Sequence, residues 1–226
     1  MRIQVRFHRH GSFSFPPFMN RNSQFHSSHR RCMGAVDVII LAAGRSSRLG
    51  QPKALVDVNG KTLIEHLVKR LHQQGNVEVT IVTNTDLLAD VMLLCPSGHV
   101  VLNSDPEKGR TGSVQCGLAS ILERNGRLPK KVLVVPVDRP GWSIEIVNEL
   151  LQLETSSCPT WNNRGGHPLL IVGDDINAVY LSVADAPLSS LIHRQSMPVD
   201  FEWLHLNIDT KEDLADLLAA SNGDWF

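Results

Sequence analysis

A run of apolar residues that starts at Val36 constrains the fold more than any other feature of the chain. Val36–Ala43 is apolar at every position except Asp37, a composition typical of a central strand that is covered on both faces. After this run the chain alternates between short apolar segments and amphipathic stretches with helical spacing. The alternation predicts an α/β fold, in which helices cover both faces of a mostly parallel sheet.

The further elements follow from the same patterns. Helices are predicted at Thr62–Gln74, Leu87–Leu94, Thr111–Arg124 and Ile144–Leu153, the last with Ser143 as its N-cap. Strands are predicted at Val77–Thr83, His99–Asn103 and Lys131–Val137. The last third is less regular. It is expected to hold a hairpin of Pro159–Asn162 with His167–Val172, helical pieces at Asp175–Leu181 and Pro187–Arg194, a final strand at Phe201–Ile208, and a helix at Lys211–Ala220 capped by Thr210.

The 226 residues suit a single domain, which we place at residues 34–226. The preceding segment differs in composition, because residues 1–36 hold six arginines, five phenylalanines and no acidic residue. Residues 1–33 are therefore interpreted as an N-terminal extension. It is either the product of a wrongly assigned start codon, with Met33 as the true start, or a disordered or targeting segment, or a real structural element. Its four histidines are too irregularly spaced to indicate a metal site.

Charge and cysteine content exclude several classes of protein. Beyond residue 36 the chain has 16 basic and 23 acidic side chains, a net charge of −7, and such a surface argues against binding nucleic acid. No apolar stretch approaches the ~20 residues of a membrane span. The four cysteines are scattered, which argues against a disulfide scaffold or a structural zinc site. We therefore expect a cytoplasmic protein; the sequence does not indicate its oligomeric state.

The loop that follows the first strand carries the clearest chemical signal. Ala42, Ala43 and Gly44 are small enough for backbone to approach a ligand closely. Arg45, Arg48 and Lys53 add positive charge, and backbone N–H groups with fixed cations suit a triphosphate. The loop matches neither a P-loop nor the G-x-G-x-x-G dinucleotide motif. On composition alone, a flexible basic loop without a ligand is the alternative.

Two aspartates follow predicted strands at the edge of the sheet where this loop lies. Asp138 comes after the apolar run Lys131–Val137, and Asp209 after Phe201–Ile208. Magnesium prefers one or two carboxylates together with phosphate oxygens and water, so both are candidate Mg²⁺ ligands. Alternatively, Asp138 caps a turn before Arg139-Pro140, and Asp209 caps the helix that follows it.

The segment LAAGRSSRLGQPK at Leu41–Lys53 resembles the L-A-[AG]-G-x-S-x-R-[ML]-G-x-x-K signature of the MobA-like NTP transferases. That family includes the cytidylyl- and guanylyltransferases of molybdenum cofactor maturation. Further similar segments extend the resemblance to about Leu218: KAL with GKTLI, Asn103 followed by Gly109, Ser113 and Gly117, PVDRP at 136–140, GGHP at 165–168, and NIDT at 207–210. The resemblance implies a Rossmann-like three-layer nucleotidyltransferase fold of the GT-A-like type.

The resemblance also implies roles for particular residues. Nucleotide binding falls to Leu41, Ala42, Ala43, Gly44, Arg45, Lys53, Asn103 and Ser113, catalysis to Arg48, Lys53 and Asp138, and Mg²⁺ binding to Asp138 and Asp209. His167 positions the acceptor substrate or supports its loop. Ser113 could equally be an ordinary residue of a first helical turn. Gly109–Ser113 reads GRTGS and departs from the family pattern.

The resemblance implies transfer of NMP from a nucleoside triphosphate to a phosphorylated small-molecule acceptor, with release of pyrophosphate. Ala43 in place of a second glycine, and the GHP segment, favour CTP and the molybdopterin cofactor as acceptor. A sugar- or alditol-phosphate nucleotidyltransferase is the alternative within the same class. A nucleotide-binding accessory domain without catalysis is the alternative outside it. A Rossmann oxidoreductase is not favoured, because the G-x-G-x-x-G motif is missing.

Overall fold

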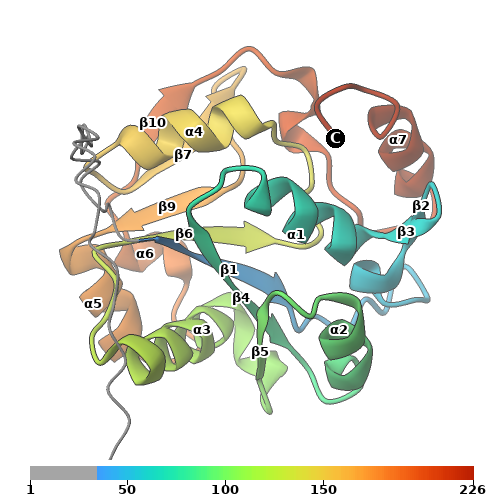
Figure 1. Ribbon diagram of the computed structural model, residues 1–226. Helices are drawn as coiled ribbons and strands as arrows, with labels where there is room; N and C mark the ends of the chain where they lie inside the picture. Colours follow the sequence, from blue (N-terminus) through green and yellow to red (C-terminus); the bar gives the residue numbers. More distant parts are fainter. Residues whose placement is uncertain (1–34) are drawn as a thin grey trace, which may run out of the picture. The chain divides into compact units, whose positions relative to one another are not determined.

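The computed structural model describes residues 35–226, and Gly34–Phe226 forms one compact unit. The hypotheses about residues 1–33 lie outside the described residues. The main sheet has the strand order β10-β7-β9-β6-β1-β4-β5, and β8 pairs with β7 (Figure 1). Its strands are β1 (Val36–Ala42), β4 (Val77–Thr83), β5 (His99–Leu102), β6 (Lys131–Pro136), β7 (Ser157–Trp161), β8 (Arg164–Gly165), β9 (Leu169–Val172) and β10 (Gln195–Pro198).

The centre of the sheet is parallel, and β9 beside it runs in the reverse direction. β1 lies between β4 and β6 and runs parallel to both, and β5 runs parallel to β4. β9 is antiparallel to β6, with Leu169 opposite Val134. The carboxyl ends of β1, β4, β5 and β6 therefore meet at one edge, and the amino end of β9 lies at that same edge.

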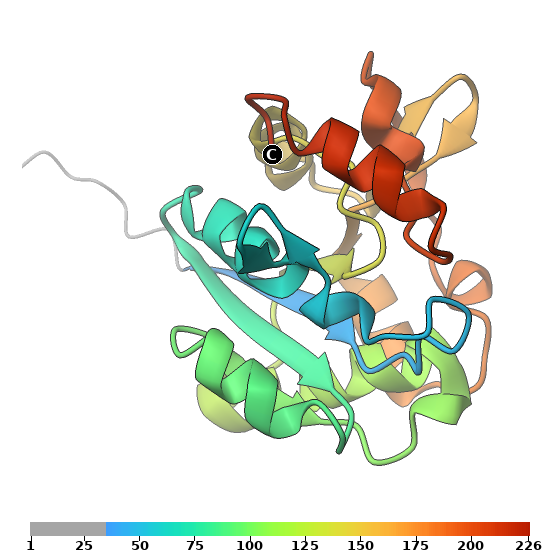
Figure 2. The same ribbon diagram turned by 90° about the vertical axis from the view of Figure 1, so that its right-hand side faces the viewer.

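Helices cover both faces, as predicted for a three-layer fold (Figures 1 and 2). Alternate residues of β1 point to opposite faces. Val38 and Ile40 belong to the core under α1 (Leu63–His72), α4 (Ile144–Gln152) and α7 (Asp213–Ala220), with a residue from α2 (Leu88–Leu94). Ile39 and Leu41 belong to the core under α3 (Gly109–Asn125) and α5 (Asp174–Leu181).

Short elements complete the fold. They are the 3-10 turns η1 (Lys53–Leu55), η2 (Pro106–Lys108) and η3 (Glu202–His205), the two-stranded ribbon of β2 (Asp57–Val58) with β3 (Lys61–Thr62), and α6 (Leu188–Leu191). At Gly117 on α3 an added Cβ would lie 2.8 Å from the side chain of Ile39, so this helix approaches β1 closely. Within residues 35–226 no helix is both long enough and apolar enough to cross a bilayer.

The helices and strands predicted between Val36 and Leu153 are confirmed to within two residues at each end, and Ser143 caps α4 by accepting a hydrogen bond from the Ile146 N–H at 3.4 Å. The predicted final strand at Phe201–Ile208 is wrong. This segment holds η3, and the last strand is β10. The Phe201 side chain of this segment packs against the C-terminal residues instead. Its ring lies 5.0 Å from that of Trp225 in an edge contact.

Two local predictions in the last third also need correction. The hairpin joins β7 to the two-residue β8 across Asn162 and Asn163, both at positive φ, whereas β7 pairs with β9 only through Ser157 and Leu170. Thr210 does not cap the last helix by accepting a hydrogen bond from it, because its hydroxyl donates to the Asp213 carboxylate at 3.2 Å. α7 starts at Asp213, two residues later than a cap at Thr210 requires.

Candidate active site

The loop that follows β1 is fixed at both ends. At its start the carbonyl oxygen of Ala43 accepts a hydrogen bond from the buried Asn84 amide at 3.1 Å. At its end the Lys53 N–H donates to the Ser46 hydroxyl at 3.0 Å. Between these two positions, the Leu49 side chain is 1% exposed and packs into the core, which anchors the loop. The backbone is thus held in place while Arg45 and Arg48 extend into solvent.

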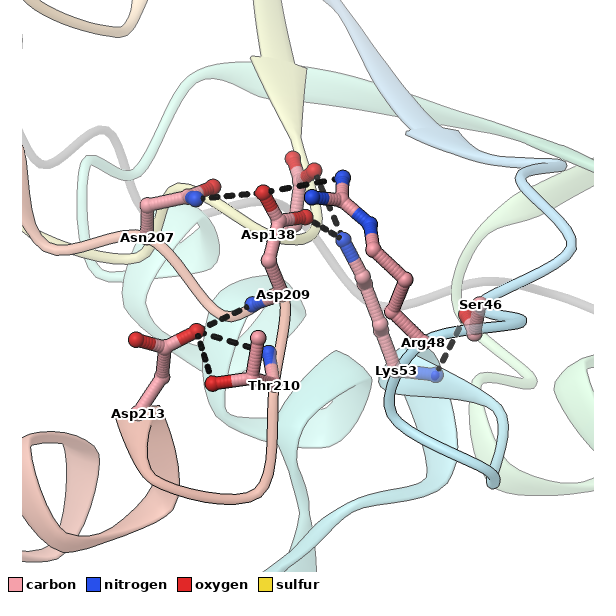
Figure 3. A network of polar contacts seen from close by, with 8 residues as sticks. All are labelled: Ser46, Arg48, Lys53, Asp138, Asn207, Asp209, Thr210 and Asp213. Atoms are coloured by element: carbon pink, nitrogen blue, oxygen red, sulfur yellow. Dashed lines mark hydrogen bonds and ion pairs between the residues drawn. The ribbon is translucent and has the colours of Figure 1, made fainter.

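Three side chains far apart in the sequence meet beside this loop (Figure 3). The Lys53 ammonium lies 3.2 Å from Asp138 Oδ2 and 2.5 Å from Asp209 Oδ1, and its side chain is only 14% exposed. The other oxygen of Asp209 lies 3.2 Å from Arg48 Nη2 and accepts a hydrogen bond from the Asn207 amide at 2.8 Å. Four residues with predicted catalytic or metal-binding roles are therefore in contact or share a partner: Arg48, Lys53, Asp138 and Asp209.

The backbone holds the two carboxylates in this arrangement. The Ile208 N–H donates to the Asp138 carbonyl at 2.9 Å and so ties the segment of Asp209 to the end of β6. From the other side the Asp213 carboxylate accepts hydrogen bonds from the backbone N–H groups of Asp209 and Thr210, both at 2.7 Å. Figure 2 shows the segment before α7 on the same side of the molecule as the blue loop after β1.

The environment of Asp209 stabilises its ionised form. Hydrogen bonds from Lys53 and then from Asn207 lower its pKa to about 2. Two carboxylates that converge on one cation are a donor set suited to a divalent ion. Within residues 35–226 no group of three or more His, Cys, Asp or Glu side chains could hold a metal. An ion here would therefore need further oxygen ligands, such as those of a phosphate.

A cavity of about 210 Å³ opens next to these groups. It is lined by the end of β1 and the start of its loop (Leu41, Ala42, Ala43, Gly44), and by Lys53, Ser113 and Asp138 among others. An adjoining hollow of about 390 Å³ shares Gly44 with it and is lined by Arg45, Asn84 and Asn103. The predicted nucleotide-binding residues thus line two cavities that share part of their walls.

Some of the predicted residues are engaged with the protein itself. The Asn103 amide donates to the Ser113 hydroxyl at 3.0 Å, and both residues are buried. Arg45 does not join the Lys53 network. Its Nε lies 2.6 Å from Glu107 Oε1, and both side chains are largely exposed. Asn103 and Ser113 shape the wall, and Arg45 stands at the rim.

His167 lies apart from the carboxylates, in a second cavity of about 330 Å³. Burial and then the charges of Arg110 and Arg139 lower its pKa to about 4, so the ring is neutral at neutral pH. Its Nδ1 is buried without a hydrogen-bond partner among the described residues. A neutral ring that lines a cavity fits contact with a ligand better than it fits an ion pair.

Four residues of the site region were not singled out from the sequence: Asn84, Arg110, Arg139 and Asn207. Asn84 follows the end of β4 directly, a position at the ligand-binding edge that the strand prediction could have marked. Asn207, which orients Asp209, lies in a segment without regular structure, and only its place in the NIDT segment at 207–210 marks it.

The chain is similar to several known proteins over most of its length. The family model described as the MobA-like NTP transferase domain matches residues 38–199. A molybdenum cofactor guanylyltransferase of Sinorhizobium fredii is 28% identical over 203 residues, covering 81% of this chain and 90% of the relative. A nicotine blue oxidoreductase of Paenarthrobacter nicotinovorans is 29% identical over 202 residues, covering 80% and 95%.

Solved structures show the same fold. Rv0371c of Mycobacterium tuberculosis has a TM-score of 0.71 at 20% identity, covering 82% of this chain and 98% of that one. A second structure of Rv0371c, a complex with manganese, has a TM-score of 0.67 at 17% identity, covering 82% and 98%. At these identities the likeness establishes the fold alone.

Proposed function

This chain belongs to the MobA-like NTP transferase family and is a nucleotidyltransferase, and from that premise we propose that it transfers NMP from a nucleoside triphosphate to a phosphorylated small-molecule acceptor. The observation that carries the proposal is the convergence of Lys53, Asp138 and Asp209 beside the cavity at the end of β1. Cations that could bind a triphosphate and carboxylates that could bind a metal ion lie next to each other there.

The reaction needs no covalent intermediate with the protein. An ionised phosphate oxygen of the acceptor forms a bond to the α-phosphorus, and the bond from that phosphorus to the bridging oxygen breaks. The electron pair leaves with pyrophosphate. Because the acceptor phosphate is already ionised, no general base is required, and the protein acts mainly through positioning and charge.

Each residue of the network has a part in this step. Arg48 and Lys53 hold the triphosphate and stabilise the charge that develops on pyrophosphate. The backbone of Leu41–Gly44 approaches the nucleotide closely, while Asn103 and Ser113 form the wall beside it. Mg²⁺ held by Asp138 and Asp209 would neutralise phosphate charge. The manganese complex of a structural neighbour supports use of a divalent ion.

We propose CTP as the nucleotide and the molybdopterin cofactor as the acceptor. Ala43 and the Gly166-His167-Pro168 segment support CTP through their resemblance to the cytidylyltransferase branch. The relative named molybdenum cofactor guanylyltransferase supports the acceptor and makes GTP the competing nucleotide. The free cysteines Cys95, Cys116 and Cys158 suit a reaction in the reducing cytoplasm.

The rival functions account for less of the site. A sugar- or alditol-phosphate acceptor would use the same network, and only the acceptor cavity distinguishes the two. A non-catalytic nucleotide-binding domain would not need two carboxylates fixed on one cation. The relative named nicotine blue oxidoreductase has a different activity in its name, but the sequence has no G-x-G-x-x-G motif for a dinucleotide.

A panel of CTP, GTP, ATP and UTP with Mg²⁺ tests the proposal. One triphosphate is expected to raise the melting temperature, because a ligand bound only by the folded state stabilises it. Pyrophosphate should then appear when that triphosphate is mixed with molybdopterin. Binding of none of the four would refute the proposal. Binding of GTP in preference to CTP would refute the nucleotide preference alone.

A further inference from the structure

The cavity that contains His167 adjoins the proposed nucleotide cavity. Leu41, Gly109, Arg110 and Pro136 line both spaces, whereas neither Lys53 nor Asp138 lines the second one. A molecule in the second cavity would therefore lie beside a bound nucleotide without displacing it. The shared boundary is where an acceptor would have to meet the α-phosphate.

The second cavity carries positive charge that the protein does not neutralise by ion pairs. Arg110 and Arg194 both line it, and neither forms an ion pair within residues 35–226. Lys108, also in the lining, is instead held by Asp105 at 3.0 Å. The guanidinium group presents several N–H donors in a plane and suits the oxygens of a phosphate. Two such groups at one cavity favour an anionic ligand.

The lining also holds one acidic residue, Asp185, so basic side chains outnumber acidic ones in this cavity. Val134, Leu169, Leu188 and Ile192 contribute apolar surface. The buried Nδ1 of His167 has no partner among the described residues, and a buried polar atom of this kind normally has one. The cavity thus offers apolar surface for an organic body, the His167 side chain and two arginines without ion pairs.

We propose that Arg110 and Arg194, with His167, bind the phosphate of the acceptor, and that the apolar wall binds its organic body. The inference rests on the proposed nucleotidyl transfer and specifies its acceptor as a phosphate monoester with a ring or another apolar surface. A small, fully hydroxylated alditol phosphate would leave the four aliphatic side chains without contact. The acceptor cavity thereby favours the molybdopterin class over the alditol class.

Phenyl phosphate is a suitable probe, because it joins a phosphate to an apolar ring. Its binding is measured by calorimetry on protein saturated with the α,β-methylene analogue of the preferred triphosphate, so that the nucleotide cavity is filled. Loss of one charge-assisted contact in Arg194→Gln or Arg110→Gln should weaken binding about 10-fold or more. Inorganic phosphate, which lacks the ring, should bind wild-type protein at least ~10-fold more weakly than phenyl phosphate.

Arg127→Gln is the matched control, because Arg127 is exposed and lies outside the cavity lining. It should bind phenyl phosphate as wild type does. Equal binding by Arg194→Gln and Arg127→Gln would overturn the phosphate site, and equal binding of inorganic and phenyl phosphate would overturn the apolar part. If no triphosphate binds but Arg194→Gln still loses phenyl phosphate, the proposed function fails and the anion site remains.

With turnover as the readout, Arg194, which lines the second cavity and not the first, acts on the acceptor alone. Arg194→Gln should raise the KM for the acceptor and leave the affinity for the nucleotide unchanged. An effect on nucleotide affinity of the same size would contradict the assignment to the second cavity.

Discussion

At the scale of single residues, Lys53 lies where the proposed divalent cation would bind. Its ammonium lies within 3.2 Å of one carboxylate and 2.5 Å of the other, and both belong to the proposed metal site. A metal ion and this ammonium cannot occupy the same position. In the free protein the lysine therefore competes with the metal, and a triphosphate that draws Lys53 to its own oxygens would remove that competition.

Replacing Lys53 with methionine tests this competition. Without the ammonium, the like-charged carboxylates of Asp138 and Asp209 should bind Mn²⁺ at least ~10-fold more tightly in the absence of nucleotide. Electron paramagnetic resonance of free Mn²⁺ measures the affinity. The kcat of the same variant should fall at least ~100-fold, because its contact with the developing charge is lost.

Lys130→Met is the control, since Lys130 is exposed and lies outside the network. Unchanged Mn²⁺ affinity in Lys53→Met would mean that the two carboxylates do not share one ion. It would remove the basis for placing the metal between Asp138 and Asp209.

At the scale of elements, the sequence predicts what is local and misses what depends on distant contacts. β4 has the predicted bounds, because an apolar run between turn residues needs no further information. Phe201–Ile208 alternates like a strand, but Trp225, more than twenty residues later, takes up the Phe201 ring. The strand predicted directly before Asp209 is absent from the structure. The place of Asp209 beside Asp138 depends instead on the Ile208 N–H and on Asp213.

The proposed active site lies at the carboxyl end of β1, and a buried acidic residue lies near its amino end. Asp37 is 7% exposed, and burial, followed by repulsion from Glu78, raises its pKa from 3.8 to about 6 despite Arg124 at 3.7 Å. Because the pKa is higher in the folded state, the folded protein binds this proton more tightly than the unfolded chain does at pH values between about 4 and 6. The free energy of unfolding contributed by this group therefore falls as pH rises from about 4 to 6, and the loss persists above pH 6.

Asp37→Asn should consequently stabilise the protein at pH 8 by about 1–2 kcal/mol and have little effect below pH 4. Urea unfolding at the two pH values measures the difference. Asp224→Asn, at an exposed position, should change stability at neither pH. Destabilisation by Asp37→Asn at pH 8 would show that the ion pair with Arg124 outweighs the cost of burial.

At the scale of the whole molecule, the mixed sheet brings the two cavities together. Parallel strands present their carboxyl ends to the proposed nucleotide cavity, as is usual in open α/β sheets. β9 runs the other way, so that His167, two residues before its first residue, reaches the same edge. A prediction of a mostly parallel sheet locates the nucleotide side of the site. It does not locate the acceptor side, because that side depends on a reversed strand and on the segment around α6.

The most direct test of the account follows the phosphorus atoms. Wild-type protein is mixed with molybdopterin, Mg²⁺ and the preferred triphosphate, labelled either on its α-phosphate or on its γ-phosphate. Nucleotidyl transfer predicts that the α-label appears in the acceptor product, that the γ-label appears in pyrophosphate, and that Asp138→Asn lowers both rates by at least ~100-fold. Transfer of the γ-label to the acceptor, or near wild-type rates in Asp138→Asn, would contradict it.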